Sequence, residues 1–428
     1  MRVLFKPRIK RYSVLLENIA ALFSIRIFEY ALSLLTIPYL VRILGPGHFG
    51  ALAFAQGIVQ YGVLLTDYGF NLTGPKNIAV CDSDEARARV FSAVMGGKAL
   101  LCALVTAVFF LGLWLSEEMR GEAKLYACVY LLVFGNVLFP IWFFQGIQKM
   151  RYITLANLTA RVFTTAGVFI FVKTREDYVV AALLQSLVPV IAGLVAWMIL
   201  YRQYRYVFSW PSLAAIASAL REGWRIFLST VAINAYTASN VVVLGLLTDT
   251  VAVGYFSAAQ KIVGCVTGLL APISQAVYPH VSRLAAVSRE QTMLFLRKYM
   301  AILSCGNFLI GVVLCGGASF LVELLLGKEY GPSVAILQLL AWLPFIISFS
   351  NVFGVQIMLP FNLQKRLSQV VLMAAFVNFC LVFPLAYAWQ GKGVALAMLC
   401  TEVFVSVAMG YWVTKYGLNP LFNIVENK

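Results

Sequence analysis

The chain contains a long series of apolar stretches, each about long enough to cross a lipid bilayer. A membrane-spanning helix needs roughly 20 apolar residues, and twelve segments of this kind follow one another along the 428 residues. Of all side chains 61% are hydrophobic and only 12% are charged, whereas about 25% charged is usual in soluble proteins. The pattern predicts an all-α integral membrane protein with twelve transmembrane helices.

The twelve predicted spans form two sets of six. The first set lies at about residues 18–43, 49–71, 91–115, 125–147, 154–172 and 179–201, and the second at about 226–247, 253–278, 300–326, 333–358, 368–389 and 393–414. A more polar stretch separates the sets. We therefore expect an N-terminal six-helix lobe at residues 1–201, a cytoplasmic linker at 202–225 and a C-terminal six-helix lobe at 226–428.

Lysine and arginine residues are concentrated on one side of the predicted membrane. If the N-terminus is cytoplasmic, the inner loops and the termini carry 22 of the 33 basic residues, and the outer loops carry 6. Such an excess is typical of cytoplasmic loops, so both termini are predicted to be cytoplasmic. The net charge of +15 is then a topology signal and gives no reason to expect nucleic acid as a partner.

The predicted loops leave little room for chemistry outside the membrane. Every outer loop has about ten residues or fewer, and the longer inner loops are expected at 72–90, 202–225 and 279–299. The two histidines, His48 and His280, are far apart, and the eight cysteines show no C-x-x-C spacing. We therefore expect no cofactor, no metal site and no enzyme activity, because a multispanning polymerase or ligase normally needs a sizeable outer loop with catalytic residues.

The two halves show a trace of internal repetition. Five residues of span two recur in span eight at a constant offset of 204: Gly50, Ala55, Gln56, Ile58 and Val59 match Gly254, Ala259, Gln260, Ile262 and Val263. Because six spans is an even number, both halves enter the membrane in the same sense. The pattern predicts a parallel pseudo-repeat about an axis along the membrane normal, which favours two lobes that rock around a central cavity.

Basic residues inside the spans are the most informative candidates for a site, since a charge at mid-bilayer costs at least ~2.5 to 3.5 kcal/mol. Arg26, Lys98 and Arg161 lie seven or eight residues into their spans, which at ~1.5 Å per residue places all three roughly 10 to 12 Å deep. This shared depth predicts a cationic layer that can receive an anionic head group. Lys261, nearer the outer face, is a candidate second station.

Other interpretations of these charges remain open. Arg26 can instead pair with Glu29, three residues on along the same helix face, and Lys98 can extend its ammonium to the inner interface. The carboxylates Glu402 and Asp67, together with Glu29, are candidates for ion coupling, because carboxylates in lipid-depth segments can exchange protons. Asp67 lies near the inner end of span two and can also be solvated or cap a helix there.

Several blocks of the chain resemble a known family. Leu44 to Phe70 (LGPGHFGALAFAQGIVQYGVLLTDYGF) is similar to the opening of Wzx-type O-antigen flippases of the polysaccharide transporter family, within the multidrug/oligosaccharidyl-lipid/polysaccharide exporter superfamily. The similarity continues through Pro140 to Thr154, Phe227 to Leu284 and Leu343 to Leu359. It covers most of the chain, and several blocks together are much more specific than any one of them.

The resemblance implies a function and a location. It implies a two-lobed transporter of the bacterial inner membrane that moves undecaprenyl-pyrophosphate-linked oligosaccharide from the cytoplasmic to the outer leaflet by alternating access. Coupling to proton or sodium antiport stays open, because relatives often carry an acidic residue where Gln260 precedes Lys261 here. Association with a polysaccharide polymerase and a chain-length regulator follows from the family alone.

The expected substrate assigns roles to intramembrane residues. We predict that the pyrophosphate is bound by Arg26, Lys98, Arg161 and Lys261. Amides and aromatic rings suit sugars, and the candidate sugar contacts are Gln56, Gln60, Tyr61, Asn234, Tyr236 and Asn240. The alternative function is a multidrug exporter of the same superfamily, for which a net acidic cavity is expected. Five basic against four acidic intramembrane residues favour the anionic substrate.

Overall fold

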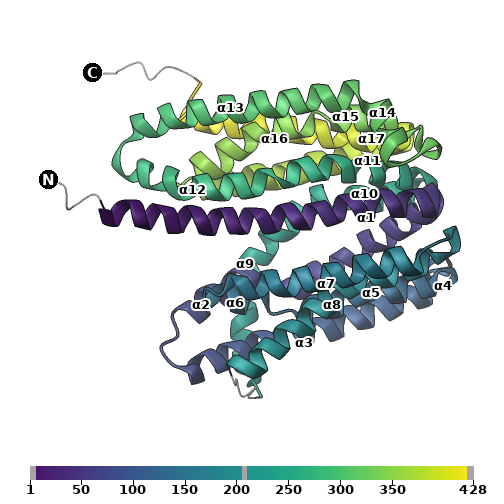
Figure 1. The fold of residues 1–428 in the computed structure, drawn as a ribbon, viewed down its shortest axis with the longest axis horizontal. Coiled ribbons are helices and arrows are strands. Elements are labelled where there is room, and N and C mark those ends of the chain that lie inside the picture. Colours follow the sequence, from purple (N-terminus) through teal and green to yellow (C-terminus); the bar gives the residue numbers. More distant parts are fainter. Residues whose placement is uncertain (1–5, 205–209, 422–428) are drawn as a thin grey trace.

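The computed structural model describes residues 6–204 and 210–421, and every regular element in these ranges is a helix. The helices form two bundles that lie side by side along their length (Figure 1). The predicted all-α membrane fold is thereby confirmed in its class. Nine helical segments within the described residues are long and apolar enough to cross a membrane.

The bundle drawn lower in Figure 1 contains the second arm of α1 and the helices that follow it. Its elements are α1 (Lys6–Asp67), α2 (Phe70–Ala79), α3 (Asp84–Leu115), α4 (Glu117–Gly121), α5 (Ala123–Leu138), α6 (Ile141–Gly146), α7 (Met150–Phe171), η1 (Arg175–Asp177) and α8 (Tyr178–Gln203). Helix α9 (Leu213–Thr237) leads from this bundle to the other one and packs against both α3 and α17.

The upper bundle in Figure 1 contains the helices that follow α9 in the chain. Its elements are α10 (Ser239–Leu247), α11 (Thr250–Gly268), α12 (Leu270–Val287), α13 (Arg289–Gly316), α14 (Ala318–Leu325), η2 (Lys328–Tyr330), α15 (Ser333–Leu340), α16 (Leu343–Asn351), the π-helix η3 (Val352–Met358) and α17 (Gln364–Lys415). The first arm of α1 runs along this bundle in Figure 1.

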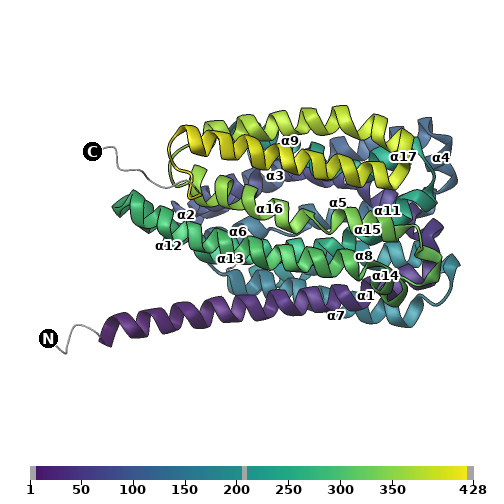
Figure 2. The same cartoon turned by 90° about the horizontal axis from the view of Figure 1, so that it is seen from above.

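Helices α1 and α17 each consist of two arms. Gly45 interrupts α1 with a φ of 69°, in the left-handed region that glycine adopts without strain. Gln390 interrupts α17 with a φ of 48°, and Figure 2 shows the two arms of α17 lying side by side. We call the end of the molecule where α1 begins and α17 ends the terminal end, and the end with the turns at Gly45 and Gln390 the distal end.

The three long inner loops that we expected are mostly helical. Helix α2 continues to Ala79 and α3 begins at Asp84, so residues 72–90 contain only a short connection. Helix α9 begins at Leu213, inside the predicted linker, and only Ser288 separates α12 from α13 within 279–299. Hydropathy detects only the part of a helix that lies in lipid, whereas these helices continue beyond it.

The repeated glycines of spans two and eight meet at the distal end, between the bundles. A β-carbon on Gly50 would lie 1.7 Å from the Thr250 carbonyl oxygen, and one on Gly254 would lie 2.0 Å from the Pro46 carbonyl oxygen. Thr250 and Gly254 lie 204 positions after Pro46 and Gly50, so the two contacts are equivalent under the repeat. Only glycine permits this close crossing of α1 and α11.

Further polar contacts join the bundles at the distal end. Arg175 of η1 forms an ion pair with Glu329 of η2. The first arm of α1 is attached to the C-terminal bundle at the same end, where Arg42 donates to the main-chain oxygen of Leu324 and the Tyr330 hydroxyl donates to the Val41 carbonyl at 3.1 Å. The bundles are therefore held together at this end by both main-chain and side-chain contacts.

Candidate functional site

A cavity of about 340 Å³ lies between the two bundles and contains two basic side chains. Arg161 reaches it from α7 of one bundle, and Lys261 reaches it from α11 of the other. The remaining lining residues are Leu32, Thr36, Ile37, Leu40, Leu132, Thr164, Thr165, Val168, Gln185, Val188 and Pro189. Two residues that are 100 positions apart in the sequence thus contribute basic side chains to one cavity.

Neutral hydrogen-bonding groups lie in the wall of this cavity, among them Gln185, Thr36 and Thr165, and Gln56 lies directly behind Gln185. Gln56 donates its amide to the Gln185 side-chain oxygen at 3.1 Å, and the Thr36 and Thr165 hydroxyls lie 3.3 Å apart. Such groups can bind sugar hydroxyls or phosphate oxygens without adding charge. Gln56 is one of the predicted sugar contacts, whereas Gln185, Thr36 and Thr165 were not predicted from the sequence.

A signal for part of this wall was present in the sequence. Thr164 and Thr165 follow Arg161 by three and four residues, the spacing that places side chains on one face of a helix. Gln185 carried no comparable signal, because its position opposite Gln56 depends on how α8 packs against α1.

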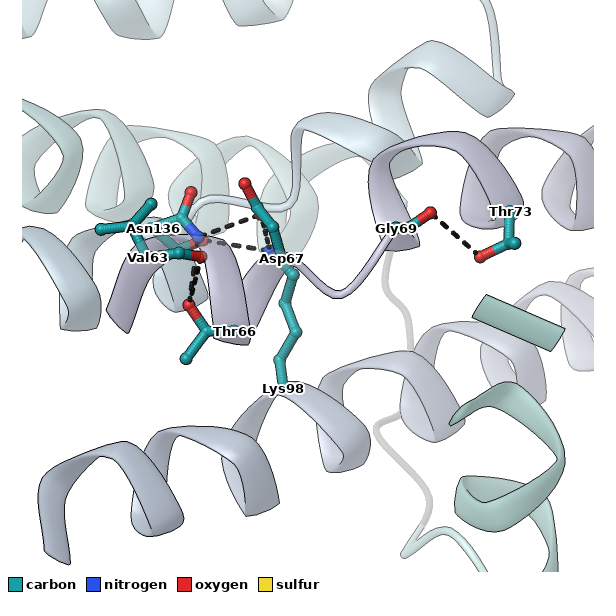
Figure 3. A network of polar contacts seen from close by, with 7 residues as sticks. All are labelled: Val63, Thr66, Asp67, Gly69, Thr73, Lys98 and Asn136. Atoms are coloured by element: carbon teal, nitrogen blue, oxygen red, sulfur yellow. Dashed lines mark hydrogen bonds and ion pairs between the residues drawn. The ribbon is translucent and has the colours of Figure 1, made fainter. Parts of the chain in front are cut away.

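Lys98 occupies a different place from Arg161 and Lys261. Its side chain is only 1% exposed, and its ammonium lies 3.1 Å from the Asp67 carboxylate and 3.3 Å from the Asn136 carbonyl oxygen. The Asn136 amide also donates to Asp67 at 3.0 Å (Figure 3). Lys98, which was predicted to bind phosphate, and Asp67, which was predicted to couple ions, therefore contact each other.

This group of three side chains, which we call the Lys98 cluster (Asp67, Lys98 and Asn136), is electrostatically self-contained. A lysine removed from water is tolerated when an opposite charge and hydrogen-bond acceptors surround it. Removing one partner of a buried pair typically costs roughly 3 to 5 kcal/mol, although Asp67 keeps 27% of its side chain exposed, which lowers this value. The cluster is not part of the lining of the cavity between the bundles.

Glu402 lines a second, smaller cavity of about 210 Å³ within the C-terminal bundle. Gln260 and Thr267 of α11 and Thr401 of α17 lie in the same cavity. The Thr401 hydroxyl also accepts a hydrogen bond from the Asn378 amide at 3.2 Å. Glu402 thus shares a mostly apolar cavity with three neutral polar side chains, and neither Arg161 nor Lys261 lines it.

The other predicted residues are distributed outside the two cavities. Gln60 is exposed, and Tyr61 hydrogen-bonds Ser239 across the bundles. Asn234 donates to the Thr230 carbonyl at 2.9 Å within its own helix, and Asn240 is fully buried. The side chains of Arg26, Glu29 and Tyr236 lie outside the part of the structure that is described.

The long apolar helices, arranged as two bundles around a cavity with two basic side chains in its wall, define a multi-pass membrane protein of the transporter class. The sequence model for polysaccharide biosynthesis proteins matches residues 15–285, and the chain belongs to this family. The predicted membership of the polysaccharide transporter family is thereby confirmed.

Two relatives cover nearly the whole chain. A protein of Escherichia coli (strain K12) assigned as an O-antigen transporter is 35% identical over 396 residues, which cover 92% of this chain and 95% of the relative. A Shigella dysenteriae protein with the same assignment is 30% identical over 92% of this chain and 98% of its own length. These relatives are transporters, which confirms the prediction of a protein that is not an enzyme.

Solved structures share the fold at low sequence identity. The lipid II flippase MurJ in an inward closed conformation superposes with a TM-score of 0.73 at 14% identity, over 92% of this chain and 87% of that one. A multidrug resistance MATE family transporter of the MOP superfamily, in an inward-facing conformation, gives the same score and identity over 92% and 96%. Both similarities concern the fold alone.

Proposed function

We propose that this protein is a flippase that moves undecaprenyl-pyrophosphate-linked oligosaccharide from the cytoplasmic to the outer leaflet of the bacterial inner membrane. The observation that carries the proposal is that Arg161 and Lys261 line one cavity although they belong to different bundles. A site built from both bundles changes its shape when they move, as alternating access requires. The O-antigen transporter relatives support the class of substrate.

The proposed topology has twelve transmembrane helices and cytoplasmic termini. Counting the two arms of α1 and of α17 separately, and adding α9 with α10 as one span, extends the nine apolar segments to twelve. The proposed lobes then correspond to residues 1–201 and 226–428, joined by 202–225. With this orientation the distal end faces outward, and the contact between Gly50 and Gly254 closes the outer side.

Charge explains why such a cavity would be needed. A pyrophosphate cannot enter hydrocarbon without a desolvation cost of many kcal/mol. Arg161 and Lys261 would replace part of the water by charge-assisted hydrogen bonds, and Arg26 would assist from the first arm of α1. We leave Lys98 out of this set, because its ammonium is already bound by Asp67.

Sugars would contact the neutral part of the wall. We propose Gln56 with Gln185 as the first contacts, since their amides are linked and Gln185 lines the cavity. Gln60, Tyr61, Asn234, Tyr236 and Asn240 stay predictions for sugar units farther from the pyrophosphate. The polyprenyl tail would remain in lipid, between the bundles.

Two sources of energy are proposed for the transport cycle. An inside-negative potential favours outward movement of negative charge by about 2.3 kcal/mol per charge per 100 mV. Proton or sodium antiport would add to this, and Glu402 is our first candidate, ahead of Asp67 and Glu29, because it lines a cavity of its own. A polysaccharide polymerase and a chain-length regulator are proposed partners.

The test is a leaflet-specific flipping assay in proteoliposomes. A lipid-linked oligosaccharide is placed in one leaflet, and its arrival in the other is followed with a membrane-impermeant sugar-binding probe. Protein-dependent transfer is the expected result. No transfer, with or without a proton or sodium gradient and a membrane potential, would contradict the proposal, and protein-dependent resistance to cationic drugs would then indicate the multidrug exporter.

A further inference from the structure

Two helices of the N-terminal bundle break at the same level. The second arm of α1 ends at Asp67, and Tyr68 and Gly69 follow with φ values of 43° and 83°. Helix α5 ends at Leu138, and Pro140 precedes α6. Because proline has no main-chain N–H and a left-handed turn ends the regular hydrogen bonding, both breaks are built into the sequence.

The two segments beyond the breaks pack closely against each other. A β-carbon on Gly74 of α2 would lie 2.6 Å from the Trp142 ring of α6, and one on Gly146 would lie 2.6 Å from Ile78. Trp142 is fully buried. Helices α2 and α6 therefore form one rigid unit at the terminal end.

Helix α9 is attached to the same unit. A β-carbon on Gly223 of α9 would lie 2.8 Å from the Tyr68 carbonyl oxygen, and the Tyr68 ring stacks on Phe227 with 4.6 Å between centroids. The Asn77 amide of α2 donates to Glu222 of α9 at 2.8 Å. Since α9 also packs against α17 and continues into α10, the unit is connected to the C-terminal bundle.

Lys98 links the two breaks from a third helix. Its ammonium binds Asp67, directly before the first break, and the carbonyl of Asn136, shortly before the second. The Asn136 amide binds the same Asp67 oxygen as Lys98, so each member contacts both others. These contacts tie the end of α1 to the end of α5 directly before α2 and α6 leave the bundle.

The C-terminal bundle breaks at a comparable place without any charge. Helix α11 ends at Gly268 and α12 begins at Leu270. The link there is made by Gln356 of the π-helix, whose amide donates to the Ser274 hydroxyl at 2.9 Å. Among the described residues at these breaks, an ion pair thus links the break in the N-terminal bundle, and neutral side chains link the one in the C-terminal bundle.

We propose that Lys98 is a positioning residue whose pairing with Asp67 sets the angle of the α2–α6 unit and thereby the distance between the two bundles at the terminal end, which is the cytoplasmic end in the proposed orientation. The proposal rests on the orientation given under the proposed function. In this proposal Lys98 and Asp67 have a positioning role, in place of the roles predicted from the sequence, which were pyrophosphate binding for Lys98 and ion coupling for Asp67.

The experiment compares Lys98→Met, Asp67→Asn and the double variant. The separation of the bundles at the terminal end is measured by the distance between spin labels at Val80 and Val287, which are 73% and 82% exposed at the ends of α2 and α12. The exposed cysteines Cys305, Cys380 and Cys400 are replaced first. We expect each single variant to shift or broaden the distance distribution and the double variant to restore it, because it leaves no unpaired charge.

Flipping is measured on the same three variants. We expect about a tenfold or larger loss of rate in each single variant and recovery of most of it in the double variant. If the flipping rate stays low in the double variant and the distances between the spin labels are unchanged in all three variants, the proposal is overturned. Lys98 or Asp67 would then have a direct role in transport. Failure of wild-type flipping would contradict the proposed function alone, because the distance measurement needs no substrate.

Discussion

Lys98 of α3 and Asp67 at the end of α1 form an ion pair of 3.1 Å in which the lysine is almost completely buried. Seen in the sequence, each is an isolated charge in or near an apolar segment. In the structure they neutralise each other, which separates them from the two basic residues that face the cavity between the bundles. Fewer basic side chains therefore line the cavity between the bundles than a count of intramembrane lysines and arginines indicates.

Replacing either basic residue of the cavity should weaken transport. We expect Arg161→Ala and Lys261→Ala each to raise the substrate concentration needed for half-maximal flipping by about 10- to 100-fold, since a hydrogen bond to a charged group contributes roughly 1.5 to 3 kcal/mol. Lys261→Arg should be milder. The control is Lys392→Ala, at an exposed position, and equal flipping in all variants would argue against a cationic site.

The glycine contact at the distal end should not tolerate side chains. In Gly50→Val or Gly254→Val the new side chain would overlap the main chain of the other bundle, so we expect the bundles to separate at this end and the melting temperature to fall. Gly306→Ala is the matched control, because nothing lies within 4 Å of a β-carbon there. Distances between labels on α4 and α14 report the separation, and unchanged distances would contradict this role.

The Arg175–Glu329 ion pair should contribute weakly to holding the distal end closed. Its side chains are 56% and 53% exposed, and exposed pairs contribute about 0.2 to 1 kcal/mol, so Arg175→Glu should shift the balance between closed and open states by no more than a few fold. The same distance measurement reports it. The exchanged pair, Arg175→Glu with Glu329→Arg, should restore the distribution, and high salt should reduce the difference between variants.

Glu402→Gln tests ion coupling. We expect flipping driven by a proton or sodium gradient to fall to the rate seen without a gradient, while the gradient-independent rate remains, because Glu402 lies apart from Arg161 and Lys261. The control is Glu323→Gln, whose side chain is 64% exposed. A response to the gradient that is identical to that of the wild type would move the coupling role away from Glu402.

Hydropathy and charge predicted the class of fold correctly, but the break between α5 and α6 at Pro140 falls inside the predicted span at 125–147. The lengths of the helices at the terminal end were underestimated, since amphipathic helices outside lipid leave no apolar signal. The offset of 204 identified the segments that cross between the bundles, but the direct contact of Gly50 with its repeat partner could not be deduced from the matches.

That this chain is a helical membrane protein, with charges in its spans that need a partner or a hydrated cavity, follows from the amino acids alone, because the transfer of each side chain into lipid depends on local composition. Which charge has which partner depends on the packing of the helices. Lys98 and Asp67 are 31 residues apart, and Arg161 and Lys261 are 100 apart. Their proximity results from the packing of helices from one or both bundles, and no local pattern encodes it.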